Sequence, residues 1–88
     1  KKMHTTMNNT KIQTIIQRAV ADFGFRQVVL YDFENINNHI QEEEKLDAEI
    51  IETIKDILIS EMQQLPIPVE PNKHEEVSNA IYSKLNLK

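Results

Sequence analysis

The chain has 88 residues, of which 40% are hydrophobic and 27% charged, with one glycine, three prolines and no cysteine. This length permits one small domain and excludes a large enzyme. The lack of cysteine excludes disulfides and thiolate sites, and fits the reducing interior of a cell. The sequence has neither an 18-residue apolar run nor a signal-like start. We therefore expect a cytoplasmic protein without a membrane partner; its first residue, Lys1, leaves open that it is a piece of a longer chain.

Charge is unevenly distributed along the chain. Residues 1–30 carry a net charge of +4, residues 31–64 carry −8, and residues 65–88 are balanced. The acidic centre would repel a phosphate backbone. The cations of the first part are dispersed and lack interleaved aromatic side chains for base stacking: Lys1, Lys2, Lys11, Arg18 and Arg26. A small nucleic-acid-binding helical regulator is therefore only an alternative, and nucleic acid is not the expected partner.

Hydrophobic residues recur at three- and four-residue intervals in four segments, at about 10–23, 25–41, 45–64 and 73–86. This spacing places them on one side of a helix. We predict an all-α protein, a small four-helix bundle in which residues 10–88 form a single helical domain. The polar residues 1–9 precede the first periodic stretch, and we expect them to be disordered.

The first two segments differ in how clearly they specify a helix. In the first, Thr10 and Gln13 match a capping box, and Gly24 suits a left-handed position after the last turn. In the second, residues 27–32 alone resemble a short strand, because they are rich in β-branched and aromatic side chains. A helix over residues 25–41 is favoured, since the longer apolar period is helical and a lone strand would lack a partner.

The third segment has more apolar surface than one helix face needs. Its main stripe consists of Leu46, Ile50, Ile54, Ile57, Leu58 and Leu65, and the residues that widen it are Ile51, Ile59 and Met62. Such width indicates either a helix surrounded by its neighbours or a spare flank offered to another chain. A ridge of carboxylates runs beside it, formed by Glu49, Glu52 and Asp56. This ridge is either a solvated face or an acidic docking surface.

In the fourth segment, Asn72 is placed to cap a helix whose apolar side is formed by Val77, Ala80, Ile81 and Leu85. The serines of the predicted helices are Ser60, Ser78 and Ser83. We expect all three at the surface or edge of a helix, because no strained turn presents them as nucleophiles.

Residue types that build a catalytic or cofactor site are sparse. The three histidines, at positions 4, 39 and 74, lack the spacing of two zinc ligands on a helix. His39 with Glu42 or Glu43 could reach a shared ion, but a solvated polar edge is the preferred interpretation. One glycine is too few for a phosphate-binding loop. We therefore predict no catalytic residue, no metal and no cofactor, and hence a protein that is not an enzyme.

One short string resembles part of a known enzyme family. Residues 28–36 read VVLYDFENI, which is similar to the opening strand motif of NYN/PIN-type ribonuclease domains, where an apolar strand ends in Asp-x-(Glu/Asp)-Asn and an aliphatic residue follows. The resemblance implies that Asp32 binds Mg²⁺ or Mn²⁺ with further carboxylates and that Asn35 positions it. It covers nine of the 88 residues, and it makes a fragment of a metal-dependent ribonuclease domain an alternative.

These observations favour a non-enzymatic protein–protein interaction module, that is, a small regulatory, adaptor or inhibitor-type helical bundle. Its expected partner-binding residues are the apolar anchors Ile51, Ile59 and Met62 and the acidic rim Glu49, Glu52 and Asp56. The expected partner is another protein, basic in charge, or a second copy in a homodimer. For the apolar anchors, a place in the core is an equally weighted alternative.

Overall fold

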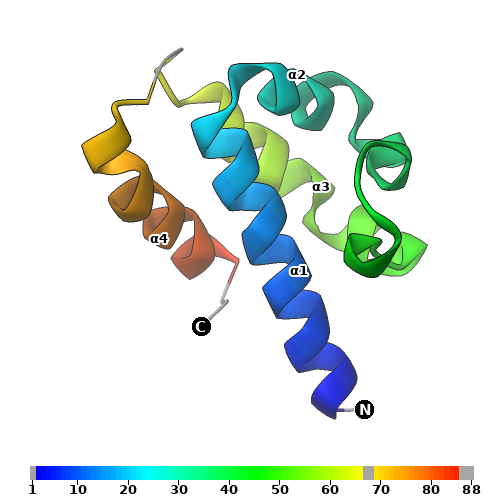
Figure 1. Cartoon of the computed structure of the whole chain (residues 1–88). Coiled ribbons are helices and arrows are strands. Elements are labelled where there is room, and N and C mark those ends of the chain that lie inside the picture. Colours follow the sequence, from blue (N-terminus) through cyan, green and yellow to red (C-terminus); the bar gives the residue numbers. More distant parts are fainter. Residues whose placement is uncertain (1, 67–68, 86–88) are drawn as a thin grey trace.

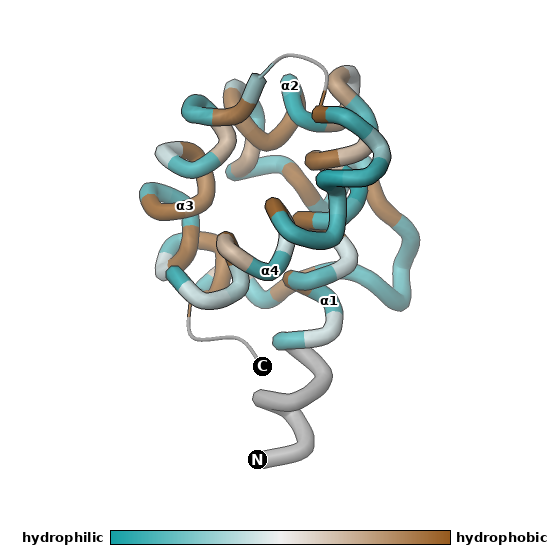
Figure 2. The backbone as a smooth tube through the Cα atoms, turned by 90° about the vertical axis from the view of Figure 1, so that its left-hand side faces the viewer, coloured by the Kyte–Doolittle hydropathy of each residue, from teal (hydrophilic) through white to brown (hydrophobic). Residues whose placement is uncertain are grey.

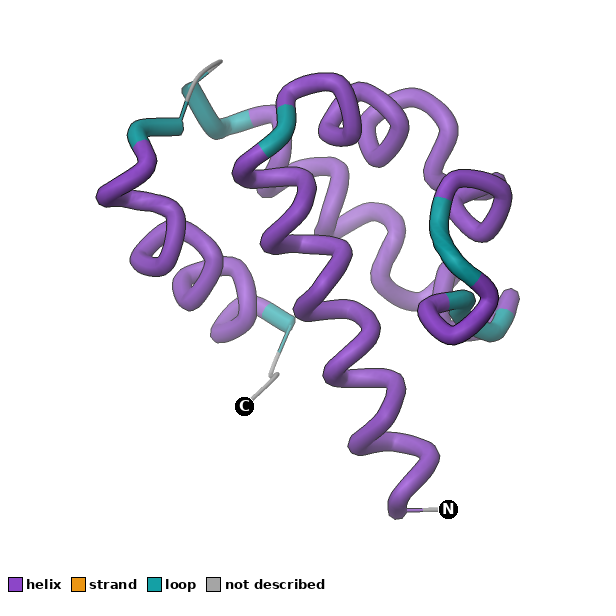
Figure 3. The backbone as a smooth tube through the Cα atoms, in the orientation of Figure 1, coloured by secondary structure: helices purple, strands orange, loops and turns teal. Residues whose placement is uncertain are grey.

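Helices make up nearly all of the regular structure of the protein, as Figure 1 shows. The computed structural model describes residues 2–66 and 69–85, and for residues 2–8 the backbone only. The α-helices are α1 (Lys2–Ala21), α2 (Phe23–Asp32), α3 (Ala48–Gln63) and α4 (His74–Lys84), and the 3₁₀ segments are η1 (Phe33–His39), η2 (Glu42–Glu44) and η3 (Pro71–Lys73). The described residues include no strand (Figure 3), so the predicted all-α bundle is confirmed and residues 27–32 are helical.

The helices pack around α1. This helix contacts α4 on one side and α2 on the other, and α3 packs against α2, η1 and α4. Figure 1 shows α4 running beside α1 while α3 lies behind them. None of the helices in residues 2–66 and 69–85 is long and apolar enough to cross a membrane.

One hydrophobic core connects all four helices. Along α2 and α3, hydrophobic and hydrophilic positions alternate as expected for amphipathic helices (Figure 2). The buried hydrophobic side chains are Ile12, Ile15, Ile16, Ala19, Val20, Phe25, Val29, Phe33, Ile36, Leu46, Ile51, Ile54, Leu58, Met62, Val69 and Ile81. Full burial of one such aliphatic or aromatic side chain contributes about 1.5–3 kcal/mol. The core therefore supplies the main stabilisation of this small domain.

α1 begins well before the predicted start at about residue 10, because its backbone is helical from Lys2. Thr10 therefore lies inside the helix, where its carbonyl oxygen accepts a 3.0 Å hydrogen bond from Thr14 Oγ1. The predicted capping box of Thr10 and Gln13 is wrong, since a cap must flank the first turn. The expected disorder of residues 1–9 in solution stays a prediction.

The junction between α1 and α2 is made by an aspartate instead of the predicted glycine. Asp22 has an extended backbone, and its Oδ1 accepts hydrogen bonds from Gly24 N at 2.9 Å and Phe25 N at 3.3 Å. Gly24 thus lies in the first turn of α2, and the left-handed position predicted for it is wrong. An N-cap aspartate satisfies the free amides of a new helix, so α2 starts as soon as α1 ends.

The predicted second helix over residues 25–41 is α-helical only as far as Asp32 and continues as η1. Asn35 and Asn37 in η1 use their side chains for hydrogen bonds to a neighbouring side chain and to the backbone of a later residue. Side-chain bonds of this kind favour turns over α-helix. Asn37 Nδ2 donates to Leu46 O, and Leu46 N donates to Asn37 Oδ1, both at 2.8 Å. This pair of bonds fixes the segment that leads into α3.

The main stripe predicted for the third segment is confirmed at Leu46, Ile54 and Leu58, which are buried, and differs from the structure at Ile57. Ile51 and Met62 are 6% and 1% exposed, whereas Ile57 is 43% exposed. At 100° per residue, Ile57 lies about 120° around the helix from Ile51. The assignment of Ile57 to the core is therefore wrong, and Ile51 and Met62 are core residues instead of members of an accessible flank.

α4 also differs from the prediction at its start and along its buried side. Asn72 lies in η3, and the N-cap residue of α4 is Lys73, without a side-chain cap, so the predicted Asn72 cap is wrong. His74 Nε2 lies 2.8 Å from Val69 O and ties the preceding linker to the helix. Ser78 is buried, whereas Ala80 is exposed. The expectation that Ser78 lies at the helix surface is therefore wrong, while Ser60 and Ser83 are exposed as predicted.

Candidate protein-binding surface

Exposed apolar side chains gather over α2 and α3. Two hollows of about 170 and 220 Å³ lie there, and Leu30 and Tyr31 line both of them. The first hollow is also lined by Ile59, and the second by Phe23 and Leu65. These five residues are called the α2–α3 surface below. Tyr31 is 79% exposed, more than the other exposed large hydrophobic side chains, Phe23 and Ile57.

The backbone of α2 explains why these side chains share one side. Phe23, Gln27, Leu30 and Tyr31 follow the i, i+4, i+7, i+8 spacing of a helix face. The core stripe of α2, which contains Phe25 and Val29, lies on a different side of the same helix. α2 therefore has one apolar stripe in the core and a second one that faces outward toward the end of α3.

Acidic side chains gather at the first hollow of the α2–α3 surface. Lys55 Nζ donates a 3.0 Å bond to Glu34 Oε2, and both residues line the first hollow. The pKa of Lys55 is raised, first by the hydrogen bond and charge of Glu34 and then by the charges of Glu52 and Asp56. Three carboxylates thus act on one ammonium, and a fourth, Asp32, lines the same hollow. The potential on this side is negative.

Two neighbouring side chains, Asn35 and His39, hold the carboxylate of Asp32. Asn35 Nδ2 donates to Asp32 Oδ1 at 2.9 Å, and His39 Nε2 lies 3.1 Å from Asp32 Oδ2. These contacts lower the pKa of Asp32, with the Asn35 hydrogen bond as the largest cause. Asn35 does position Asp32, as the nuclease motif implies. Asp32 is the last residue of α2, however, so the strand that the motif implies before Asp32 is wrong. The described side chains, those of residues 9–66 and 69–85, contain no cluster of three potential metal ligands.

The structure brings together only part of the predicted partner-binding set. Ile59 lies half-buried on the α2–α3 surface, and Glu52 and Asp56 are exposed close to Lys55. Glu49 is exposed one turn earlier on α3. Ile51 and Met62 are buried and are not exposed anchors, although Met62 lines the second hollow.

Sequence reasoning missed the α2 side of this surface. The signal was present, because Leu30 and Tyr31 did not fit the core stripe of the second segment. An apolar residue that fits no core stripe is a candidate for an exposed contact. The helical period of residues 23–31 would have grouped both with Phe23.

Some of the basic side chains of residues 9–30 are held by contacts within the fold. Arg26 is 2% exposed, and Lys11 Nζ donates a 3.0 Å bond to Lys45 O. The guanidinium of Arg18 lies over the Phe25 ring, 4.4 Å from its centroid. The cations considered for nucleic-acid contact are thus fewer than the sequence suggested, because a buried Arg26 cannot reach a phosphate.

Comparison with known proteins does not assign a family or a function to the chain. No protein-family model, no curated protein and no solved structure matches the chain. The function is therefore argued from the surface itself.

Proposed function

We propose that the protein is a non-enzymatic interaction module that binds a basic amphipathic helix of another protein on its α2–α3 surface. The observation that carries this proposal is the position of Tyr31, 79% exposed between two hollows. Tyrosine is enriched among the residues that dominate binding energy, because its ring buries a large area and its hydroxyl tolerates water. A regulatory, adaptor or inhibitor role fits such a module.

The shape of the surface suits a helix. The two hollows share Leu30 and Tyr31 as lining residues and are therefore adjacent, so apolar side chains from successive turns of one helix can enter them. Helix-in-groove binding uses apolar anchors spaced by three or four residues in this way. The half-buried Ile59 and Leu65 form the apolar floor at the α3 side of the two hollows.

The charge of the surroundings selects a basic partner. Glu34, Glu52 and Asp56 act on one lysine, Lys55, and Asp32 lines the same hollow as Glu34 and Lys55. Opposite charge accelerates encounter and disfavours acidic competitors, and its effect weakens as salt screens it. We therefore expect lysine or arginine residues along the edges of the apolar face of the bound helix.

Two synthetic peptides test this proposal on the full chain. Both carry leucines at positions i, i+3, i+4 and i+7, and the flanking residues are lysine in one and glutamate in the other. We expect the lysine peptide to bind, with faster association at low salt, and the glutamate peptide to bind much more weakly. Fluorescence anisotropy measures both affinities. Equal binding of the two peptides, or binding of neither, contradicts the proposal.

Matched variants locate the contact. Tyr31→Ser and Ile59→Ser should each weaken binding of the lysine peptide by about tenfold or more, as expected for anchors. Ile57→Ser is the control, because Ile57 is exposed on another side of α3. An equal effect of Ile57→Ser would place the contact elsewhere. Sedimentation at several concentrations identifies self-association, and a dimer lost in Tyr31→Ser would replace the proposed partner with a second copy.

A further inference from the structure

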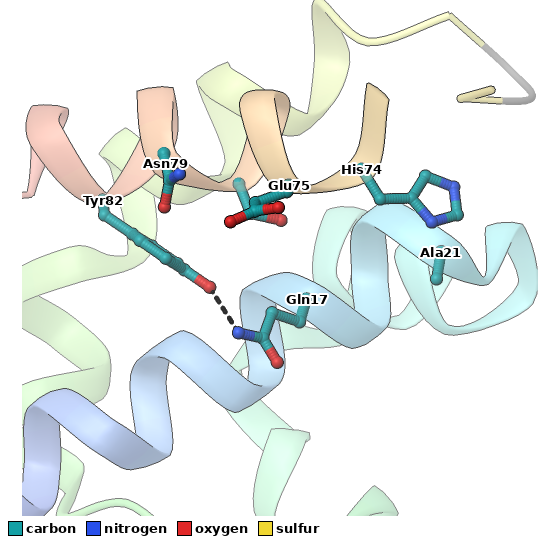
Figure 4. A pocket seen from close by; sticks show the side chains of 7 residues that line it. Gln17, Ala21, His74, Glu75, Asn79 and Tyr82 are labelled. Carbon is teal, nitrogen blue, oxygen red and sulfur yellow. Dashed lines mark hydrogen bonds between the residues drawn. The ribbon is translucent and has the colours of Figure 1, made fainter. Parts of the chain in front are cut away.

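A separate hollow of about 440 Å³ lies between α1 and α4. None of its lining residues belongs to the α2–α3 surface. The polar side chains that line it are Gln17, His74, Glu75, Ser78, Asn79 and Tyr82. Figure 4 shows Gln17 of α1 facing Tyr82, Glu75 and Asn79 of α4, with His74 and Ala21 at the other end.

Ser78 has an unusual environment for a helical serine. It is 4% exposed, yet its hydroxyl makes no hydrogen bond with another described residue. Serine and threonine within helices often bond to the carbonyl four residues earlier, as Thr14 does with Thr10 and Thr53 with Glu49. Among the side chains of residues 9–66 and 69–85, every fully enclosed nitrogen or oxygen has a partner. The Ser78 hydroxyl therefore opens into the hollow, where an unmet donor and acceptor are unfavourable without a ligand or water.

The other side chains define what the hollow accepts. Among the described residues, Glu75 is the only acidic side chain that lines the hollow, and no lysine or arginine lines it. The Glu75 carboxylate forms no ion pair with a described residue. Gln17 Nε2 donates a 2.8 Å bond to the Tyr82 hydroxyl, which fixes the Tyr82 ring at one end. His74 Nε2 is engaged with Val69 O. The hollow thus combines one negative charge, an aromatic ring and several amide and hydroxyl groups.

We infer that this hollow binds a small hydroxylated amine. The ammonium group of the ligand pairs with the Glu75 carboxylate, and its hydroxyls exchange hydrogen bonds with Ser78 and Asn79. The ring of Tyr82 gives the ligand an apolar face to pack against. Pockets of this size hold small molecules whose orientation is set by a few polar groups. A ligand of this size in an open hollow binds in the millimolar range.

Three sugars of one scaffold test the inference by NMR titration of the full chain. Glucosamine carries an ammonium group, glucose is neutral and glucuronate is negative. We expect glucosamine to shift the amide signals around residue 17 and residues 74–82, glucose to shift them less at equal concentration, and glucuronate to leave them unchanged. If glucosamine shifts no signals at this site, or if the three sugars act equally, the inference is overturned and the hollow holds water only.

Two substitutions on α4, at Ser78 and Glu75, distinguish binding of glucosamine in the hollow from nonspecific binding to the protein surface. Ser78→Ala should weaken glucosamine binding by roughly 2- to 10-fold, the effect of one neutral hydrogen bond, while Ser83→Ala, on the exposed side of the same helix, should have no effect. Glu75→Gln should remove the preference for glucosamine over glucose. Unchanged binding in Ser78→Ala, with its spectrum still folded, overturns the inference. Tyr31→Ser should leave glucosamine binding intact, so this outcome is independent of the proposed helix-binding function.

Discussion

Arg26 Nη1 donates a 2.7 Å hydrogen bond to the carbonyl oxygen of Pro66, 40 residues later in the chain. The same guanidinium donates from Nε to Ala19 O and from Nη2 to Val20 O, both at 3.1 Å. The last carbonyls of a helix have no partner within it, so Arg26 closes the end of α1 and ties it to the segment after α3. Burial lowers the pKa of Arg26 below its ordinary value, but its planar fork remains a charged donor.

We predict that Arg26→Ala lowers the free energy of unfolding by about 2–4 kcal/mol, because it leaves three carbonyls without their charged donor. Arg26→Lys should lose less but not recover fully, since one ammonium cannot reproduce the guanidinium fork. Urea unfolding followed by circular dichroism measures both. An Arg26→Ala variant as stable as the parent would mean that water replaces all three bonds without loss.

The cap of α2 gives a second prediction. Asp22→Ala should reduce the free energy of unfolding by about 1 kcal/mol, because Gly24 N and Phe25 N lose their acceptor. Asp22→Asn should retain most of the stability, since asparagine is an equally good cap. Thermal unfolding of the three proteins gives the comparison.

Asp47 offers a matched control for this cap. It is also an N-cap aspartate, at the start of α3, but its side chain makes no capping hydrogen bond. Asp47→Ala should therefore cost clearly less than Asp22→Ala, because only the weaker interaction of its charge with the helix dipole is lost. Equal losses at both positions would assign the effect of Asp22 to charge instead of the cap.

The sequence predicts the core side of α1 because its apolar residues form one narrow stripe, and it predicts the core side of α2 because the longer helical period of the second segment separates the core stripe from Leu30 and Tyr31. Ile12, Ile15 and Ile16 are buried as expected, and so are Phe25 and Val29. A narrow stripe has one orientation that buries it. α3 has apolar residues on more than one flank, so several rotations bury nearly equal areas, and only packing against α2, η1 and α4 selects among them.

Contacts between distant residues limited the prediction of the functional residues. Nothing near Arg26 in the sequence indicates that its partner is the carbonyl of Pro66, and the unbonded hydroxyl of Ser78 depends on how α4 packs against α1. By contrast, the exposed position of Tyr31 follows from its misfit to the core stripe. Helical period therefore predicts which side a residue takes, and tertiary packing determines its partner.

The contacts of Asp32 predict its titration. Its pKa lies below the ordinary value near 3.8 because of the Asn35 and His39 hydrogen bonds and the His39 charge. Asn35→Ala should raise this pKa toward the ordinary value, and Asn38→Ala, whose side chain does not touch Asp32, should not change it. Carboxyl chemical shifts followed against pH measure both effects.

The lowered pKa of Asp32 also makes the free energy of unfolding depend on pH. A carboxylate whose pKa is lower in the folded than in the unfolded state stabilises the fold at pH values above the unfolded pKa. For Asp32 this contribution is present above about pH 4 and is lost as the pH falls through the lower folded value. In Asn35→Ala, the free energy of unfolding should therefore fall less steeply as the solution is made more acidic. An unchanged pH dependence would show that the hydrogen bond between Asn35 and Asp32 does not persist in solution.

The rotation of α3 can be tested with two isoleucines of the same helix. Ile51 is 6% exposed and Ile57 is 43% exposed. Removal of a buried isoleucine side chain to alanine costs about 2–5 kcal/mol through lost burial and the cavity left behind. Ile51→Ala should therefore destabilise strongly, whereas Ile57→Ala should cost less than about 1 kcal/mol, because alanine also favours the helix. The predicted core position of Ile57 requires that Ile57→Ala also costs about 2–5 kcal/mol. Urea unfolding of both variants decides between the two rotations, and equal losses would mean that both side chains are buried in solution, as in a dimer formed through the Ile57 side of α3.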